Sequence, residues 1–564
     1  MKSGEILENR EGAYAGLILP GTDPLVILSA LDWESLQEGK GKQLLEELIL
    51  PTYLPRCRWF AGKSKTIRYT KVQDVIPAWE TPDAARMLLI EISYVHGLPE
   101  VYLLPMQIVV QTAVLDLAQY SSMAVIAFFD DGQTKWALLD GIFDRDFRRA
   151  LLKLVASEER LAGRNGVVRG IAGQGLGGIG GMGHLGKGLE SLVLKVDQSN
   201  SSIAYADKLF LKLYRKLESG MNPDAQIIRF LSEKQHFAKV PPFAGAIEYQ
   251  DGGGDLRVLG LFLGSVKNQG NAWDYTLKAL RGFYERIGAH GVSVDGLAPT
   301  QLFRPFKPST LLEDLQDFPD RVRQLAQATG EMHLALAAES SDPQFCPEAI
   351  TADSQRILCE SMEGFVRETF EMVRAKLDTL AESKMRAMAD QVMELEEEVV
   401  RRQKRLLRHP IHAALTRTHG DYHLGQVLFT GNDFVIIDFE GEPSRPLQER
   451  MLKRSPLRDV AGMLRSFHYA AHVGLAEAKA SREEASHLSE QWANVWAGQI
   501  SWIFLDEYLK TVAGACFIPE KTEDLQILLE AFLLEKAIYE VLYELNNRPA
   551  WLPIPFRGIL DILV

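Results

Sequence analysis

Cysteine is scarce in this chain, and its four examples lie far apart. Cys57, Cys346, Cys359 and Cys516 form no CxxC pair among the 564 residues. Closely spaced cysteines are the usual signature of a zinc site or of a disulfide framework. The sequence therefore predicts neither, and scattered thiols of this kind suit a reducing cytoplasm.

Long apolar runs are also missing. A membrane-spanning helix needs about 18 or more consecutive apolar residues, and no segment approaches that length. The opening stretch, MKSGEILENREGAY, lacks the apolar core of a secretory signal peptide. We therefore expect a cytoplasmic protein without a membrane partner.

Basic residues are outnumbered by acidic ones. The chain has 62 Lys and Arg residues against 75 Asp and Glu residues, a formal net charge of -13. Nucleic acids and anionic membranes bind basic surfaces, which release counterions or meet acidic lipid. We therefore expect no nucleic-acid partner.

The apolar content is sufficient for more than one core. Hydrophobic residues make up 46% and charged residues 24% of the chain, as in globular proteins. Single cores stop growing at about 250 to 300 residues, so a chain of this length predicts at least two lobes.

Predicted strands come first and predicted helices afterwards. Short apolar runs separated by Gly, Pro and Asp predict mainly strands over residues 11–150, with one helix at about 44–50. Further strands are predicted at 189–196, 208–214 and 256–262, with a connection at 197–207. Beyond about residue 264 the pattern is helical, apart from short strands at 426–429 and 434–437. A small β-rich lobe before a larger helical lobe favours an α+β fold with the bilobal architecture of protein kinases.

The glycine-rich tract at residues 163–188 is predicted to be a mobile loop, either a linker or a lid. Gly173 to Gly178 satisfies GxGxxG, and Gly181 to Lys187 nearly satisfies the P-loop pattern, but Gly188 stands where a Ser or Thr is required. Both motifs must open a helix, whereas residues 189–196 predict a strand. We therefore do not assign phosphate binding to this tract.

Phosphoryl-transfer chemistry is indicated by the stretch HGDYHLGQVLFTGNDFVIIDFEGEP. Such chemistry needs a carboxylate near the acceptor hydroxyl and oxygen ligands for Mg²⁺ on the nucleotide. Asp421 is the candidate base, and Gln426 and Asp438 are the candidate metal ligands. The step from Asp421 to Gln426 matches the kinase D-x-x-x-x-N loop, with Gln in place of Asn.

His423 lies two residues after Asp421, and we count it as a second candidate catalytic residue. His419 and His423 are four residues apart, the spacing of a helical zinc pair. Gly420 and Gly425 interrupt a helix, however, and no HExxH motif is present. The kinase interpretation is therefore preferred to a zinc site.

A kinase also needs a lysine on a small-lobe strand to contact the nucleotide phosphates. Lys212, in KLFLKLYRK, alternates with apolar residues and is the candidate, with Lys208 as the competitor. A solvated strand lysine is the alternative for either one. The helix opened by Asn222-Pro223 carries Gln226 where a glutamate partner is usual, so either Asp224 replaces it or the lysine is held by hydrogen bonds alone.

With these residues in place, the sequence resembles the bacterial maltokinases over most of its length from about Leu48. The resemblance rests on several blocks: LPTYLPRCRWFAGK, QSNSS, KLYRKLESGMNPD, HGDYHLGQVL, DFEGEPSRPLQER, RDVAGMLRSFHYAA and EKAIYEVLYELNNRPAWLPIP. It implies an aminoglycoside-phosphotransferase-like kinase with an N-terminal cap at 1–145, a small ATP-binding lobe at 146–264 and a helical lobe at 265–564. The implied cofactors are ATP and Mg²⁺, and the implied product, maltose 1-phosphate, enters α-glucan synthesis.

The resemblance also implies further site residues. The nucleotide phosphates would be covered by the turn made of Gln198, Ser199, Asn200, Ser201 and Ser202. The sugar would be bound by Glu440, Tyr469, Lys536, Tyr539, Glu540 and Tyr543. Residues 536, 539, 540 and 543 share one helix face, where tyrosine rings can stack on a sugar. The alternative is ordinary tyrosine packing with an i,i+4 salt bridge between Lys536 and Glu540.

Other functions remain open at this point. An aminoglycoside or choline kinase shares the same motifs, and Gln226 and Gln426 also fit a non-catalytic pseudokinase. Maltokinases occur fused to trehalose synthase, which is therefore an expected partner. Trehalose synthase activity itself needs a glycosidase barrel with paired carboxylates, for which the chain has no matching pattern.

Overall fold

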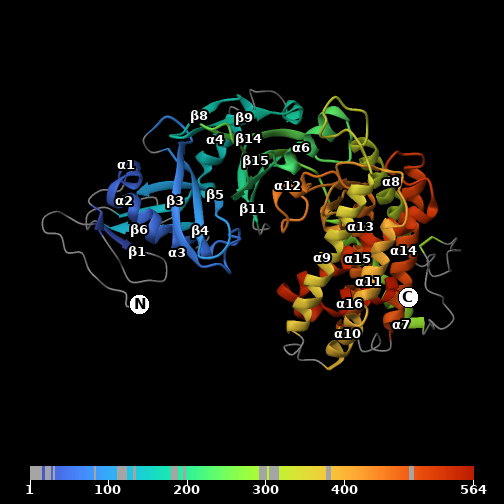
Figure 1. Cartoon of the computed structure of the whole chain (residues 1–564). Helices are drawn as coiled ribbons and strands as arrows, with labels where there is room; N and C mark the ends of the chain where they lie inside the picture. The colour runs from blue at the N-terminus through green and yellow to red at the C-terminus, as the bar shows by residue number, and fades with distance from the viewer. Residues whose placement is uncertain are drawn as a thin grey trace. The chain divides into compact units, whose positions relative to one another are not determined.

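Contacts divide the chain of the computed structural model into two units, each with its own core (Figure 1). The first unit comprises Met1–Arg229 and Pro242–Ser265, and the second comprises Phe230–Pro241 and Val266–Val564. The structure describes residues 15–18, 27–28, 32–81, 84–110, 124–130, 135–179, 189–194, 199–290, 302–303, 317–376, 383–481 and 488–563. Within these ranges, no helix is long and apolar enough to cross a membrane.

The first sheet of unit 1 is antiparallel and forms the N-terminal part of the chain, coloured blue to cyan in Figure 1. Its strand order is β2-β1-β6-β7-β5-β4-β3. The strands are β1 (Ala15–Ile18), β2 (Ile27–Leu28), β3 (Ile67–Pro77), β4 (Arg86–Tyr94), β5 (Glu100–Val110), β6 (Val125–Asp130) and β7 (Lys135–Asp140). The predicted strands of this region are thus confirmed.

A helical segment covers the buried face of this sheet. It runs through α1 (Trp33–Gln37), α2 (Gly39–Leu44), η1 (Leu45–Ile49), α3 (Leu50–Tyr53) and η2 (Leu54–Arg56). Ile49, Leu50 and Leu54 are fully buried and pack with Ile90 and Leu104 of the sheet. The helix predicted at about 44–50 is therefore present and is part of a longer helical run.

The second sheet of unit 1 has the strand order β10-β11-β12-β15-β14-β9-β8. Its strands are β8 (Arg160–Ala162), β9 (Gly166–Ala172), β10 (Ser191–Val193), β11 (Asn200–Tyr205), β12 (Leu209–Tyr214), β14 (Phe243–Asp251) and β15 (Leu256–Gly264). Helix α4 (Arg145–Ala156) packs against β9 and β14. Asn222 accepts a hydrogen bond from the Asp224 amide and caps helix α6 (Pro223–Arg229), as predicted.

Part of the predicted glycine-rich loop is a strand, so that prediction was wrong for residues 166–172. Strand β9 pairs with β14, and its glycine at position 170 lies directly under α4. A Cβ atom on Gly170 would come 2.0 Å from the carbonyl oxygen of Leu154, so only glycine allows this approach. Residues 174–179 form a 3-10 helix, η5. The rest of the tract, 180–188, lies outside the described residues.

The predicted connection at 197–207 was also wrong, because it contains strand β11. Ser201, Ile203 and Tyr205 alternate along one face and are buried, while the intervening positions face the other side. The polar residues at the start of the strand hide this period-two pattern in the sequence. Residues 195–198, including Gln198, lie outside the described residues.

Unit 2 is mainly helical, as predicted, and its helices run from green through yellow to red in Figure 1. The long ones are α7 (Ala272–His290), α8 (Phe318–Leu336), α9 (Ala352–Lys376), α13 (Leu457–Ser481), α14 (Glu490–Thr511) and α15 (Thr522–Asn547). Shorter helices are α10 (Ser383–Met393), α11 (Glu396–Gln403), α12 (Leu447–Arg450) and α16 (Pro553–Leu563). Helix α13 packs against α7, α14 and α15, which places it in the middle of the unit.

Two short strands interrupt the helices at the predicted positions. Strand β18 (Val427–Phe429) pairs with β19 (Phe434–Ile436) in a hairpin. This hairpin lies between His419-Gly420-Asp421 and Asp438. Its strand register therefore helps to set the positions of the two ends of the predicted catalytic stretch relative to each other.

Candidate active site

Lys212 lies on β12 and forms an ion pair with Asp224. The ammonium is 3.0 Å from the Asp224 carboxylate, and the two side chains are 13% and 1% exposed. Asp224 also accepts a hydrogen bond from the hydroxyl of Tyr214. Of the two alternatives for the lysine partner, the structure therefore shows the one in which Asp224 takes the place of a glutamate at position 226.

The predicted phosphate-covering residues lie at the start of β11. Ser202 stands opposite Lys212 in the antiparallel register, so their side chains share one face of the sheet. Ser199 is exposed, and Asn200 is half-buried on the face of Ser202. Ser201 points to the opposite face, where its hydroxyl accepts a hydrogen bond from Arg215. The nucleotide-binding role of these residues remains a proposal.

The predicted base, Asp421, sits in a loop that a buried aspartate anchors. Asp459 of α13 accepts hydrogen bonds from the backbone amides of His419 (2.7 Å) and Gly420 (2.9 Å). It also contacts Nε2 of His333 at 3.2 Å. Burial tends to raise the pKa of Asp459, but the bond from His333 and the nearby donors hold it below its usual range. An ionised carboxylate therefore fixes the loop that carries Asp421.

Gly420 has a backbone conformation that other residues rarely adopt. Its φ is +85°, and a Cβ atom there would lie 3.1 Å from the Cα of Gly441. Glycine at 420 thus allows the loop before Asp421 to pass close to the segment that follows Asp438. The two parts of the predicted motif are in contact at this point.

His419 ties the same two segments together through its ring. Its Nε2 lies 2.9 Å from the carbonyl oxygen of Ile437, so this nitrogen must carry the proton and donate. The other ring nitrogen then accepts the backbone N–H of Asp421 at 3.4 Å. The ring also packs against Tyr422 and Phe439. His419 therefore has a structural role in the loop, which agrees with rejecting it as a zinc ligand.

Gln426 and Asp438, the predicted metal ligands, are neighbours. The Gln426 amide donates a hydrogen bond of 2.8 Å to a carboxylate oxygen of Asp438. Asp438 has a φ of +68°, a left-handed conformation that is uncommon for aspartate and is found at functional sites. Mg²⁺ prefers oxygen ligands and usually takes only one or two protein carboxylates, with phosphates and water completing its shell. One amide and one carboxylate side by side fit that requirement.

Asp421 is held by Lys536 of α15. The lysine ammonium donates hydrogen bonds to Oδ1 of Asp421 (3.1 Å) and to Oε1 of Glu442 (3.2 Å). Burial favours a lower pKa for Lys536, but the two carboxylates outweigh it and raise the pKa above the ordinary value. Lys536 is therefore a fixed positive charge beside the predicted base.

Glu442 is a site residue that sequence reasoning missed. It is 3% exposed and also receives hydrogen bonds from Arg445 (2.7 Å) and Arg458 (3.4 Å). Burial acts to raise its pKa, yet Lys536 and the two arginines lower it to about 2. The only signal in the sequence was its position inside the DFEGEP block. Glu442 thus holds the Lys536 ammonium from the side opposite Asp421.

His423 lies beside Asp421 without a direct hydrogen bond to it. Its Nε2 is 3.9 Å from Oδ2 of Asp421, and its Nδ1 accepts the backbone N–H of Gly425. Burial lowers the pKa of His423 more than the Asp421 charge raises it. A neutral imidazole therefore faces the second carboxylate oxygen, and its catalytic role remains a prediction.

The positions implied for sugar binding fall into two groups. In the first group, Lys536 contacts Asp421, and its ammonium lies 4.6 Å from the centre of the Tyr539 ring. Tyr543 stacks beside Tyr539 and is 44% exposed. Tyr469 and Glu540 are more enclosed: the Tyr469 hydroxyl donates to Glu544, and Glu540 accepts two hydrogen bonds from Arg465. Glu440 is half-buried two residues after Asp438. Sugar binding at these residues remains a proposal.

The alternative of a salt bridge between Lys536 and Glu540 is not what the structure shows. Lys536 pairs with Asp421 and Glu442, whereas Glu540 pairs with Arg465 at 2.6 Å. Helical spacing suggested a pair between Lys536 and Glu540. Instead, the loop that carries Asp421 provides a partner for Lys536, and Arg465 of α13 is the partner of Glu540. The helix face is thus tied to the predicted base.

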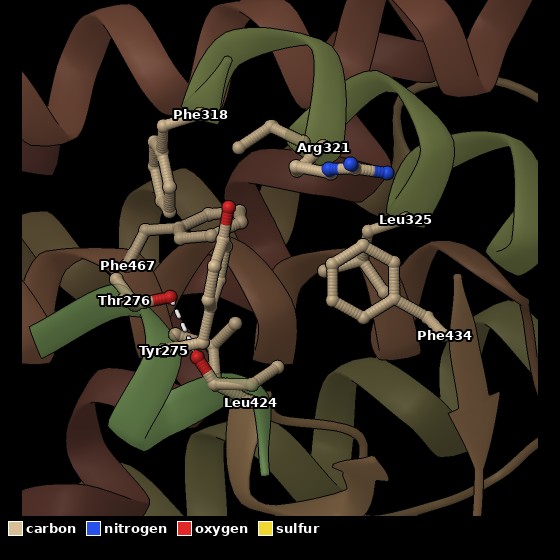
Figure 2. Close-up of a pocket in the computed structure, with 10 residues that line it drawn as sticks. Tyr275, Thr276, Phe318, Arg321, Leu325, Leu424, Phe434 and Phe467 are labelled. Carbon is tan, nitrogen blue, oxygen red and sulfur yellow. Dashed lines mark hydrogen bonds between the residues drawn. The ribbon is translucent and has the colours of Figure 1, made fainter. Parts of the chain in front are cut away.

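A small cavity next to the catalytic loop is part of the core. Figure 2 shows Tyr275, Phe318, Phe434 and Phe467, from α7, α8, β19 and α13, lining the cavity together with Leu424. Its volume is about 10 Å³, roughly the space of a single water molecule. The side chains that line this cavity pack against Leu424 of the loop that carries Asp421, and the space is too small for a sugar.

The fold and the site define a kinase of the phosphotransferase type. Along the chain, two sheets come before the helices of unit 2. Lys212, on a strand and paired with the carboxylate of Asp224, is followed in sequence by Asp421, Gln426 and Asp438. The model of the phosphotransferase enzyme family matches residues 192–493, more than half of the chain. The chain therefore belongs to this family. The maltokinase N-terminal cap domain matches residues 53–144, which confirms the resemblance to maltokinases.

Two curated proteins that are similar to this chain are glucosamine kinases. One from Streptacidiphilus jiangxiensis is 24% identical over 242 residues, 43% of this chain and 48% of that protein. One from Mycolicibacterium smegmatis (strain ATCC 700084 / mc(2)155) is 26% identical over 155 residues, 26% of this chain and 34% of that protein. The matched stretches thus span half or less of these relatives.

A solved structure of a glucosamine kinase in complex with glucosamine, ADP and inorganic phosphate has a TM-score of 0.58 to this chain. The two are 16% identical, and the alignment covers 91% of this chain and 97% of that one. At this identity the likeness establishes the fold, which confirms the predicted α+β kinase-like class.

Proposed function

We propose that the protein transfers the γ-phosphoryl group of ATP to the reducing-end hydroxyl of maltose, giving maltose 1-phosphate and ADP. Two lines of reasoning support a sugar acceptor of this kind. The chain carries a maltokinase cap domain at residues 53–144. In addition, the charges around Asp421 favour a neutral acceptor over a cationic one.

The observation that carries the proposal is the position of Lys536. An acceptor hydroxyl that reaches Asp421 must come near the ammonium, which lies 3.1 Å from the same carboxylate. In glucosamine, a second ammonium sits on the carbon next to the anomeric one. Two like charges about 5 Å apart repel by about 3 kcal/mol at an effective dielectric constant of about 20.

Apart from Asp421 itself, the neighbouring carboxylates offer little compensation for a bound cation. Glu442 is paired with Lys536, Arg445 and Arg458. Glu540 is paired with Arg465, and Glu544 with Arg548. These ion pairs already engage Glu442 and the acidic side chains at positions 540 and 544 of α15. A neutral sugar, which needs hydrogen bonds and an aromatic surface, suits the same environment.

The reaction assigns separate tasks to the two oxygens of Asp421. Lys536 holds Oδ1, so Oδ2 is the oxygen that accepts the proton of the acceptor hydroxyl. The acceptor oxygen forms a bond to the γ-phosphorus as the bond from that phosphorus to ADP breaks. Lys212, fixed by Asp224, would bind the nucleotide phosphates. Mg²⁺, held by Gln426 and Asp438, would neutralise charge on those phosphates.

The proposal is tested by an acceptor panel. The protein would be incubated with ATP and Mg²⁺ and with maltose, glucose, trehalose, glucosamine, choline or an aminoglycoside, while ADP release is followed. We expect the highest kcat/KM with maltose and a phosphorylated product at its anomeric carbon. Preference for any cationic acceptor would contradict the assignment.

Glucosamine is the second candidate acceptor, because two similar curated proteins bear the name glucosamine kinase. The fixed ammonium of Lys536 argues against it for this chain. The same panel separates the two candidates, since both sugars are measured with one enzyme preparation.

A further inference from the structure

Arg215 is a buried arginine at the junction of the two sheets of unit 1. It lies three residues after Lys212 and is 0% exposed. Its guanidinium donates 2.7 Å hydrogen bonds to the Ser201 hydroxyl and to Asp140, and it contacts the carbonyl oxygen of Leu103 at 3.5 Å. The Trp59 ring lies 4.8 Å from the guanidinium carbon. One side chain thus joins β11 to the matched cap domain.

The backbone crosses the same junction. After β12, residues 216–217 form a short strand, β13, which pairs with β5 of the cap sheet. The Leu103 amide donates a 2.7 Å hydrogen bond to the carbonyl oxygen of Arg215. The strand that carries Lys212 in one sheet therefore continues directly as a strand of the other sheet.

The partner of Arg215 on β11 is located where it can influence nucleotide binding. Ser201 is flanked by Asn200 and Ser202, whose side chains lie on the face of Lys212. Successive residues of a strand point to opposite faces. When Arg215 holds the Ser201 side chain on one face of β11, it therefore also fixes how the side chains of Asn200 and Ser202 are presented on the other face. A displacement of Arg215 would reach both β11 and β12.

The ion pair of Arg215 with Asp140 is costly to bury. Asp140 is 1% exposed, and burial raises its pKa even though the Arg215 charge opposes the shift. A buried pair is often no more stabilising than apolar packing, so its presence calls for a reason beyond stability. The arginine fork fixes several oxygen acceptors in one geometry, which a lysine cannot do.

We propose that Arg215 is a positioning residue through which the cap domain sets the geometry of the nucleotide-binding strands β11 and β12. The inference rests on the proposed function in one respect, the binding of ATP by these strands. It adds a task for the cap: Asp140, Leu103 and Trp59 hold the guanidinium that orients Ser201 and the strand of Lys212.

The test measures ATP affinity by calorimetry without any acceptor. Arg215→Lys keeps the charge but loses the fork, and Asp140→Asn alters the cap side of the junction while keeping its shape. We expect each variant to weaken ATP binding about tenfold, as if about one charged hydrogen bond to the nucleotide were lost through the displaced strands. The kcat at saturating ATP should change less than about twofold. Arg169→Lys is the matched control, because Arg169 pairs with the buried Glu248 in the same sheet, away from β11.

Thermal unfolding of the same variants separates positioning from stability. The inference is overturned if Arg215→Lys and Asp140→Asn lower the melting temperature but bind ATP as the wild type does. It is also overturned if Arg169→Lys loses as much ATP affinity as they do. A wild type that binds no ATP would overturn the proposed function as well. A wild type that binds ATP, with both junction variants unchanged, would overturn this inference alone.

Discussion

The ammonium of Lys536 lies 3.1 Å from Oδ1 of Asp421, although the two residues are 115 positions apart in the chain. Helix α15 supplies the lysine, and the loop anchored by Asp459 supplies the aspartate. Glu442 holds the lysine from its other side at 3.2 Å. The predicted base is therefore fixed and charge-balanced, and the account of function depends on this contact.

Replacing the base should abolish turnover without removing the nucleotide site. Asp421→Asn keeps the size of the side chain but cannot accept the hydroxyl proton, so we expect kcat to fall by about 100- to 10,000-fold. Calorimetry should show ATP binding close to that of the wild type. Asp433→Asn is the control, because Asp433 lies in the β18–β19 turn and is 49% exposed. Near-normal turnover of Asp421→Asn would show that another group is the base.

The choice between the two strand lysines can be decided by a paired substitution. Lys212 is ion-paired with Asp224, whereas Lys208 is exposed. We expect Lys212→Met to weaken ATP binding by about 10- to 100-fold, the value of a charged hydrogen bond, and Lys208→Met to leave it unchanged. Calorimetric titration with ATP and Mg²⁺ measures both. The reverse order of effects would assign the phosphate contact to Lys208.

The anchor of the catalytic loop should affect turnover more than binding. Asp459→Asn places an amide where the carboxylate accepts two backbone N–H groups. Because a shift of about 1 Å in the base costs about 100-fold in rate, we expect a loss of that size in kcat. Steady-state kinetics should show the KM for ATP nearly constant. An unchanged kcat in a folded variant would mean that the loop holds its shape without Asp459.

Glu442 should contribute stability that depends on pH. Its pKa is about 2 in the folded protein, below the ordinary 4.5. A lowered carboxyl pKa stabilises the fold above about pH 4.5, and the stabilisation is lost as the pH falls from about 4.5 towards 2. The full contribution is on the order of 3 kcal/mol.

Urea unfolding of wild type and Glu442→Gln between pH 6 and 3 measures this contribution. The difference in the free energy of unfolding should be largest at pH 6 and should shrink below pH 4.5. Glu449→Gln is the control, because Glu449 pairs with the same Arg445 but is 48% exposed. A difference that is constant across the pH range would contradict the assignment.

The order of the reacting groups could be predicted from the sequence because it is local. Asp421, Gln426 and Asp438 lie within one short stretch with a fixed spacing, and Lys212 stands on an alternating strand. The carboxylate partner at Asp224 was one of two open alternatives. Its selection depended on how α6 sits against β12, which no spacing rule provides.

The supporting residues could not be predicted, because their partners are distant in the chain. His333 contacts Asp459, Asp459 accepts hydrogen bonds from the loop that carries Asp421, and Glu442 contacts Lys536 of α15. Each would pass as an ordinary buried or surface polar residue in a local pattern. Strands β9 and β11 were missed for another reason: glycine and serine disguise the period-two alternation, and tertiary packing decides the structure there.

The most direct test of the central claim is the ratio of kcat/KM for maltose to that for glucosamine, measured on the wild type and on Lys536→Met. Both acceptors are assayed on one preparation, so a general loss of activity cancels in the ratio. We predict a wild-type preference for maltose of about 100-fold or more, reduced at least about tenfold in the variant, because the repulsion of about 3 kcal/mol disappears. A wild type that prefers glucosamine, or a ratio that Lys536→Met leaves unchanged, would contradict the account.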